Sequence, residues 1–156
     1  MIPYSMHLNF ELLLHLLVHR KETLRQHRTI HQIVTMASLI EKEAVLNTDR
    51  EIVSGILWKR LNLGIPLQVD ATLIFLTGRK NAKVLYADTA IDSPYNTYKY
   101  KGLPKGPIAN PGLSAIHAAL YPKASPYLYY LSAPDGHIIF SRTLKEHNIA
   151  KAKYLK

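Results

Sequence analysis

The amino-acid sequence predicts an α+β fold with a helical N-terminal half, long irregular loops and a C-terminal portion that contains a β-hairpin. Apolar residues recur at helical spacing through most of the first sixty residues, whereas residues 83–112 are rich in Pro, Gly, Asn, Ser and Tyr. Two β-rich runs then flank Pro134-Asp135-Gly136. A chain of 156 residues with 47% hydrophobic content can bury one core, so we expect one main domain.

The first predicted helix covers residues 8–27. Its leucines recur at helical spacing, and basic residues follow toward its C-terminal end, which is typical of an amphipathic helix. The apolar stretch contains Glu11 and His15 and is shorter than the roughly 20 residues that a membrane-spanning helix needs. No basic segment with a cleavage site accompanies it. We therefore expect no signal or transmembrane segment in the chain as written.

Two further helices are expected in the N-terminal half. Residues 29–45 form the second helix, with Thr29 in a suitable position for its N-cap. The third helix is expected over residues 47–63, capped by Asn47 or Thr48 and stopped by the Gly and Pro that follow.

The C-terminal part of the chain alternates short elements with irregular structure. Residues 70–78 form a short helical candidate, and residues 83–112 form a loop of a length that is uncommon in compact domains and tends to be functional. A helix is expected over residues 113–122, and residues 127–141 contain the hairpin signal.

The composition is basic, with a net charge of +9 and a pI of about 9.7. An anionic partner is therefore expected, either nucleic acid, an anionic lipid surface or a polymer that carries carboxylates. The basic residues fall in separate clusters along the chain, which favours a solvated basic surface over a nucleic-acid stripe. We expect no nucleic-acid binding.

Several kinds of site are excluded or not favoured. The chain has no cysteine, which excludes disulfides, thiolate nucleophiles and cysteine-ligated zinc. The pairs His15/His19 and His27/His31 have a spacing that metals accept, but no third ligand follows in a defining context. Gly-rich phosphate loops and nucleophile elbows are also absent from the sequence. We expect neither a metal nor a cofactor.

Two carboxylates at the end of the second predicted helix, in "SLIEKEAV", are candidates for acid–base chemistry. The apolar stripe of this helix defines a buried side, Lys42 lies opposite, and Glu41 and Glu43 fall on the two flanks. Helical geometry leaves open which of them faces a cleft. A half-buried carboxyl has a raised pKa and can hold a proton near neutral pH, whereas two solvated glutamates would be ordinary surface residues.

Two other clusters carry groups that suit a carbohydrate. Gln68 and Asp70 can bind hydroxyl or acetamido groups, although the residues alone favour Asp70 as the cap of the helix that follows. Tyr95, Asn96 and Tyr98 combine aromatic rings with an amide, a common way to hold a sugar ring, or form a surface turn.

Four segments, in this order, resemble the catalytic domain of the MltG (YceG-like) family of endolytic murein transglycosylases. They are "TMASLIEKEA", "LNLGIPLQVDATLIF", "SPYNTYKYKGLPKGPIANPGLSAIHAALYP" and "YLYYLSAPDGHIIFSRTLKEHN". The resemblance implies cleavage of the β-1,4 bond between N-acetylmuramic acid and N-acetylglucosamine in peptidoglycan, with formation of 1,6-anhydro ends. It implies peptidoglycan strands as the partner, cell-wall synthases as further partners, and a place at the outer face of the cytoplasmic membrane.

The resemblance places the catalytic residue in the "EKE" motif. We assign it to Glu43, with Glu41 in reserve, and we expect the glycan groove to be lined by Gln68, Asp70, Tyr95, Asn96 and Tyr98. Most glycosidases use two carboxylates, but a lytic transglycosylase uses the C6 hydroxyl of the sugar as nucleophile, so that one carboxyl can serve as acid and then as base.

The sequence departs from the family pattern in three ways. Ala71 stands where the family often has Pro, and Lys105 stands where a second Pro is usual. Family members usually carry an N-terminal membrane anchor and a LysM-like subdomain, and neither is visible here. We therefore expect a truncated form, in which residues 1–28 are a helical remnant of a longer protein and residues 29–156 are the catalytic domain.

Two alternative functions stay open at this point. A hydrolytic muramidase would use Asp70 or Asp92 as a second carboxylate and would leave reducing ends. A non-catalytic peptidoglycan-binding module would keep its function in a Glu43→Gln variant.

Overall fold

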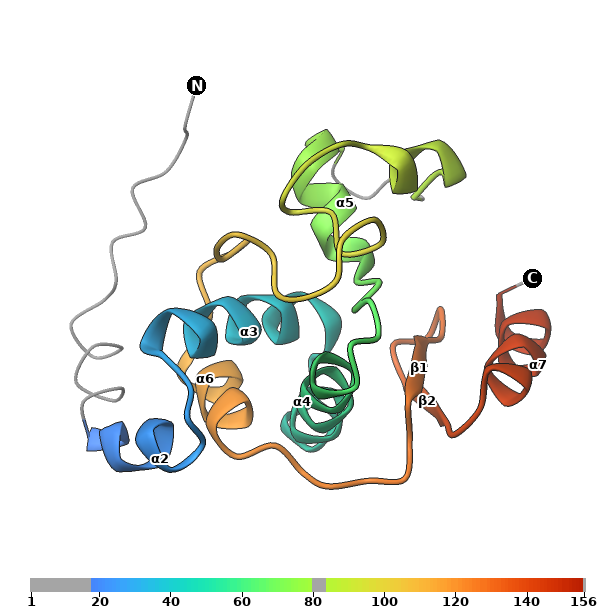
Figure 1. The fold of residues 1–156 in the computed structure, drawn as a ribbon. Coiled ribbons are helices and arrows are strands. Elements are labelled where there is room, and N and C mark those ends of the chain that lie inside the picture. Colours follow the sequence, from blue (N-terminus) through green and yellow to red (C-terminus); the bar gives the residue numbers. More distant parts are fainter. Residues whose placement is uncertain (1–17, 80–83, 156) are drawn as a thin grey trace.

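The structure is a computed structural model that describes residues 18–79 and 84–155. Most of the first predicted helix lies outside the described residues, and its C-terminal part is seen as α2 (Arg20–Arg25). Three helices form the centre of the fold: α3 (Ile30–Glu43), α4 (Asn47–Asn62) and α6 (Leu113–Leu120), which pack on one another (Figure 1). Their apolar side chains supply most of the hydrophobic core.

Helix α3 lies at the middle of this core. It begins at the predicted N-cap, where the Thr29 hydroxyl accepts from the Gln32 backbone N–H and the Gln32 side chain accepts from the Thr29 N–H. Every residue from 33 to 40 is buried, so the helix is covered on all sides along this stretch. Its C-terminal turn, which carries Glu43, emerges from the core.

Helix α4 starts one residue earlier than the predicted cap allows. Leu46 is the N-cap residue and provides no side-chain cap, so the prediction of Asn47 or Thr48 is wrong. The Asn47 side chain instead accepts a hydrogen bond from the Ser114 hydroxyl at 2.6 Å, and it thereby joins the starts of α4 and α6. Because the Asn47 side chain makes this tertiary contact, it does not cap the backbone N–H groups at the start of α4.

A short helix and a long loop lie over α3. Helix α5 (Asp70–Thr77) ends at Gly78, which adopts a left-handed φ of 65°. The predicted irregular region contains one 3₁₀ helix, η1 (Tyr86–Ala90), and then runs without regular structure across α3 to α6 (Figure 1). Ser38 of α3 accepts from the Ile108 N–H at 3.0 Å and ties this loop to the core.

The C-terminal part is a hairpin with a helix packed on it (Figure 1). Strands β1 (Tyr129–Ser132) and β2 (Ile138–Ser141) pair antiparallel, and Gly136 in the turn between them has a φ of 88°. Helix α7 (Leu144–Tyr154) follows and is absent from the sequence-based prediction. The predicted α+β fold class is confirmed. Among the described residues, no helix is long and apolar enough to cross a membrane.

Candidate active site

Glu43 lies at the last turn of α3, half-buried against the hairpin and the start of α5. The Tyr130 hydroxyl donates to its Oε2 at 2.9 Å. Burial raises the pKa of Glu43 to about 7. The hydrogen bond from Tyr130 and the N–H of Ala71 oppose this rise, whereas the charge of Asp70 adds to it. A carboxyl with this pKa exists in both protonation states near neutral pH, as an acid that must later act as a base requires.

Glu41 occupies the opposite flank of the same turn and has different partners. Its Oε2 accepts from the Gly112 N–H at 3.1 Å, and its Oε1 accepts from Arg50 at 3.2 Å. The side chain of Glu41 therefore joins the end of α3 to the first residue before α6 and to α4. Both of its oxygens are engaged in holding helix ends together.

Asp70 and Tyr98 form a hydrogen-bonded pair close to Glu43. The expected cap role of Asp70 is wrong, because Val69 is the N-cap residue of α5 and the Asp70 carboxylate accepts from the Tyr98 hydroxyl. Burial, and next the bond to Asp70, raise the pKa of Tyr98, and the charge of Glu43 acts in the same direction. Tyr98 is therefore a neutral hydroxyl throughout the physiological pH range.

Gln68 is held in an uncommon backbone conformation just before α5. Its φ is 54°, in the left-handed region, and its N–H donates to the Thr97 carbonyl at 3.0 Å. Its Oε1 accepts from Arg60 at 2.8 Å. Because arginine only donates, the amide oxygen must face Arg60, and the two Nε2 protons of the exposed Gln68 side chain are directed elsewhere.

Asn96 is buried and organises the loop that carries Tyr98. Its amide nitrogen donates to the carbonyls of Thr89 and Ile91 at 3.0 and 2.8 Å, and its oxygen accepts from the Tyr98 N–H at 2.9 Å. Asn96 therefore acts on the site through the position of Tyr98.

Tyr95 and Asp92 lie in the same loop but have partners of their own. The Tyr95 ring packs on Phe75, farther along α5, with ring centres 5.1 Å apart. Asp92 is exposed, accepts from the Tyr100 hydroxyl and pairs with Lys99 at 3.1 Å; these contacts lower its pKa. Of the two candidates for a second carboxylate, Asp70 is thus the one whose charge acts on Glu43.

Comparisons with known proteins identify the family of the chain. The model of the YceG-like family matches residues 4–153, which is nearly the whole chain. The chain belongs to the YceG-like family. The match extends N-terminally beyond the four segments that first indicated the resemblance.

Individual relatives of this YceG-like chain support the same conclusion. It is 46% identical over 137 residues to an endolytic murein transglycosylase of Bacillus subtilis, covering 88% of this chain and 38% of the relative. An endolytic murein transglycosylase of Streptococcus pneumoniae is 32% identical over 133 residues, covering 81% and 24%. A crystal structure of a YceG-like protein from Listeria monocytogenes superimposes with a TM-score of 0.83 at 44% identity, covering 88% and 45%. The chain thus spans less than half the length of each of these relatives.

Two residues that contact the candidate site residues in this YceG-like chain were not predicted from the sequence. Arg60 is buried, follows Ile56 and Leu57 at helical spacing, and could have been found from that spacing. Tyr130 lies in a run of tyrosines and leucines whose pattern does not mark it out. Among the described residues, no group of three or more His, Asp or Glu side chains is arranged to hold a metal.

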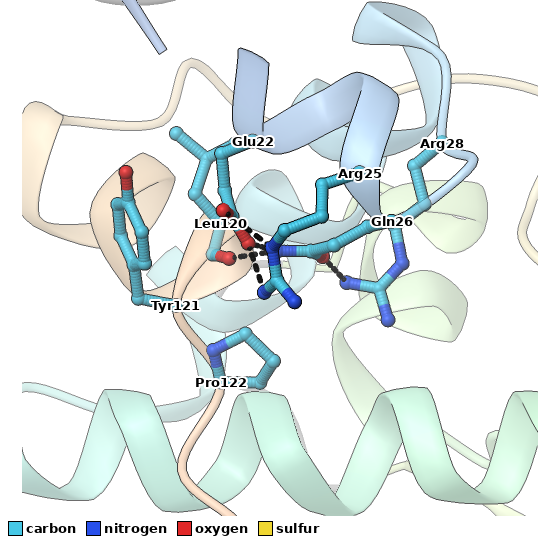
Figure 2. A pocket seen from close by; sticks show the side chains of 7 residues that line it. All are labelled: Glu22, Arg25, Gln26, Arg28, Leu120, Tyr121 and Pro122. Carbon is cyan, nitrogen blue, oxygen red and sulfur yellow. Dashed lines mark hydrogen bonds and ion pairs between the residues drawn. The ribbon is translucent and has the colours of Figure 1, made fainter. Parts of the chain in front are cut away.

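A separate polar cavity of about 450 Å³ lies between α2 and the end of α6 (Figure 2). Arg25 donates to both carboxylate oxygens of Glu22 at 2.9 and 2.6 Å, and the pKa of Glu22 falls to about 2 through its bonds to Arg25 and Gln26. The charges of Arg25 and Glu22 therefore neutralise each other. No member of the Glu43 cluster lines the cavity, so it is distinct from the candidate active site.

Proposed function

We propose that this chain carries the acid–base centre of an endolytic lytic transglycosylase that cleaves the β-1,4 bond between N-acetylmuramic acid and N-acetylglucosamine in peptidoglycan. The observation that carries the proposal is Glu43: a half-buried carboxyl with a pKa of about 7, beside polar side chains from three other segments. The relatives from B. subtilis and S. pneumoniae, both named endolytic murein transglycosylases, support it.

The proposed reaction needs only Glu43 as a catalytic residue. The protonated carboxyl gives its proton to the glycosidic oxygen, the bond from C1 to that oxygen breaks, and positive charge develops on the muramic ring. The C6 hydroxyl of the same sugar attacks C1 and forms the anhydro bond, while the Glu43 carboxylate takes the hydroxyl proton. Glu43 ends in its starting form, and the attacking oxygen is already held near C1, which favours the step entropically.

The groups around Glu43 are suited to bind the glycan. Gln68 offers amide protons, because its oxygen is held by Arg60, and such donors match the carbonyl oxygens of acetamido groups. Asp70 and Tyr98 supply oxygens that can bind sugar hydroxyls. Tyr95 with Phe75 provides an aromatic surface on which a sugar ring can stack, and Asn96 keeps the Tyr98 loop in place.

Hydrolysis is the second candidate, and one observation favours it. Asp70 is near enough for its charge to raise the pKa of Glu43, so a second carboxylate is available. A muramidase that used Asp70 as base or nucleophile would form reducing ends. The bond from Tyr98 to Asp70 favours a binding role, since it engages one of the two carboxylate oxygens that could otherwise activate water.

Digestion of purified glycan strands tests the proposal, with mass spectrometry to identify the new ends. Wild type is expected to give 1,6-anhydro ends, and Glu43→Gln is expected to lose at least about 10²-fold in rate with its fold intact. Glu41→Gln is the matched control; it removes a structural carboxylate two residues away and is expected to keep turnover in proportion to its folded fraction. Reducing ends would favour the muramidase, and equal cleavage by wild type and Glu43→Gln would exclude Glu43 as the acid.

The same proposal gives the chain a partner and a place. Peptidoglycan strands are the substrate, and the net charge of +9 suits a polymer that carries carboxylates. We place the chain in the cell envelope, at the outer face of the cytoplasmic membrane, with cell-wall synthases as further partners and no nucleic acid.

A further inference from the structure

We propose that Tyr130 is a positioning residue that holds Oε2 of Glu43 and stabilises the carboxylate formed when the acid gives up its proton. The inference rests on the function proposed above and assigns a second residue to the same site. It starts from the 2.9 Å hydrogen bond from the Tyr130 hydroxyl to Glu43 Oε2.

Tyr130 lies on β1, and contacts with the core and with α4 hold this strand in place. Tyr130 pairs with Phe140 across the hairpin, and both rings pack against the hydrophobic core. The strand that carries Tyr130 is anchored to α4, because Arg60 donates to the Leu128 carbonyl at 3.3 Å and Lys59 donates to the Tyr127 carbonyl at 3.0 Å. The donor is therefore in place before substrate arrives, so no energy is needed to orient it during the reaction.

In the hydrogen bond between Tyr130 and Glu43, the tyrosine hydroxyl is the donor. Burial, and then the charge of Glu43, raise the pKa of Tyr130 well above its ordinary value, so its hydroxyl stays a neutral donor at working pH. A hydroxyl bonds more strongly to a carboxylate than to a neutral acid. The bond therefore favours the charged form of Glu43 and opposes the effect of burial.

Other groups also act on Glu43 and would remain if the Tyr130 hydroxyl were removed. The charge of Asp70 comes from α5, with the backbone N–H of Ala71 beside it, and the Tyr98 hydroxyl comes from the loop. Arg60 of α4 acts on the two tyrosines by its charge. A Tyr130→Phe variant changes none of these groups, so its difference from wild type isolates the hydroxyl.

The test combines a direct titration with kinetics. The Glu43 carboxyl of ¹³C-labelled protein is followed by NMR from pH 4 to pH 9 in wild type, in Tyr130→Phe and in Tyr129→Phe. Tyr129 is the matched control, because it is the preceding residue of β1 and its side chain points to the opposite face of the strand. We expect the pKa of Glu43 to rise by about one pH unit in Tyr130→Phe and to stay at the wild-type value in Tyr129→Phe.

The kinetic part of the test uses glycan strands. In Tyr130→Phe we expect the alkaline limb of kcat to move to higher pH by the same amount as the titration, and kcat below pH 6 to fall about tenfold, with KM changed less than about twofold. An unchanged Glu43 titration in Tyr130→Phe, or an equal change in Tyr129→Phe, would overturn the inference. Should the titration shift as expected while wild type cleaves nothing, the Tyr130 assignment is supported and the proposed function fails.

Discussion

At the scale of single residues, Glu41 and Glu43 show how position within one helical turn separates two identical side chains. Two residues apart on a helix, they point to opposite flanks. Glu41 meets Arg50 and a backbone N–H and serves as a tie between helices. Glu43 accepts from a partly buried tyrosine and lies near a second carboxylate, and burial outweighs the hydrogen bond, so its pKa rises to about 7. The neighbours decide the chemistry, because the side chains are the same.

The raised pKa of Glu43 predicts a pH-dependent loss of stability. The folded carboxyl binds its proton more tightly than the unfolded one, whose pKa is near 4.5. The protonated Glu43 therefore makes its full contribution to folding stability below about pH 4.5. This contribution falls as pH rises and is lost above about pH 7. We expect Glu43→Gln to be more stable than wild type at pH 8 by about 1–3 kcal/mol, and to lose most of this advantage at pH 4.5. Urea denaturation at both pH values measures the difference, and an advantage that does not depend on pH would contradict it.

At the scale of elements, Gly55 allows the chain to cross α4 closely. A Cβ at this position would lie 2.0 Å from the Lys123 carbonyl oxygen, and the Lys123 N–H donates to the Glu51 carbonyl one turn earlier. Since the Cβ position is fixed by the helix backbone and the Lys123 oxygen is itself a backbone atom, relief would require the segment after α6 to move. We expect Gly55→Ala to destabilise the fold by about 1–3 kcal/mol despite the higher helix propensity of Ala.

Thermal unfolding of Gly55→Ala checks this expectation, with Asn62→Ala as the control. Asn62 is exposed at the end of the same helix, so its replacement changes propensity without a clash. A Gly55→Ala protein as stable as wild type would show that the segment after α6 can yield at no cost.

The elements that the sequence predicts well are those with local signals. Thr29 caps α3 through a contact three residues away, and the turn around Gly136 needs only its own φ. Asn47 and Asp70 failed as predicted caps because distant residues, Ser114 and Tyr98, take their side chains. Helix α7 was missed although Thr143 accepts from the Glu146 N–H, a local capping signal that the basic character of the tail obscured.

At the scale of the whole molecule, the candidate site is assembled from segments that are distant in sequence. Glu43 comes from α3, Asp70 from α5, Tyr98 from the long loop and Tyr130 from the hairpin. The sequence indicated the pair of glutamates and the polar clusters as candidates, because such groups are visible as residue types. It could not indicate that Tyr130 would face Glu43, since that contact spans 87 residues and depends on how the hairpin docks.

The docking of the hairpin and the position of the turn before α5 both depend on Arg60. This buried guanidinium donates to the Pro66 carbonyl at 2.7 Å, to Gln68 Oε1 at 2.8 Å and to the Leu128 carbonyl at 3.3 Å. Burial lowers its pKa, and the oxygens that accept its hydrogen bonds replace part of the hydration that the buried charge has lost. One side chain thus joins α4, the turn before α5 and the hairpin that carries Tyr130.

We therefore expect Arg60→Met to affect stability and the site together. The variant keeps an apolar stem of similar length, but it leaves the Pro66, Gln68 and Leu128 oxygens without their donor, which should cost about 2–4 kcal/mol of unfolding free energy. Lys59→Met is the comparison: Lys59 donates to the carbonyls of Ser125 and Tyr127 in the same segment, so its loss should cost about 1 kcal/mol and change the Glu43 titration less than Arg60→Met does. Urea denaturation and ¹³C titration of Glu43 in both variants measure these effects. If Arg60→Met is no less stable than Lys59→Met and titrates like wild type, the hairpin and the turn before α5 are held by other contacts, and Arg60 does not organise the site.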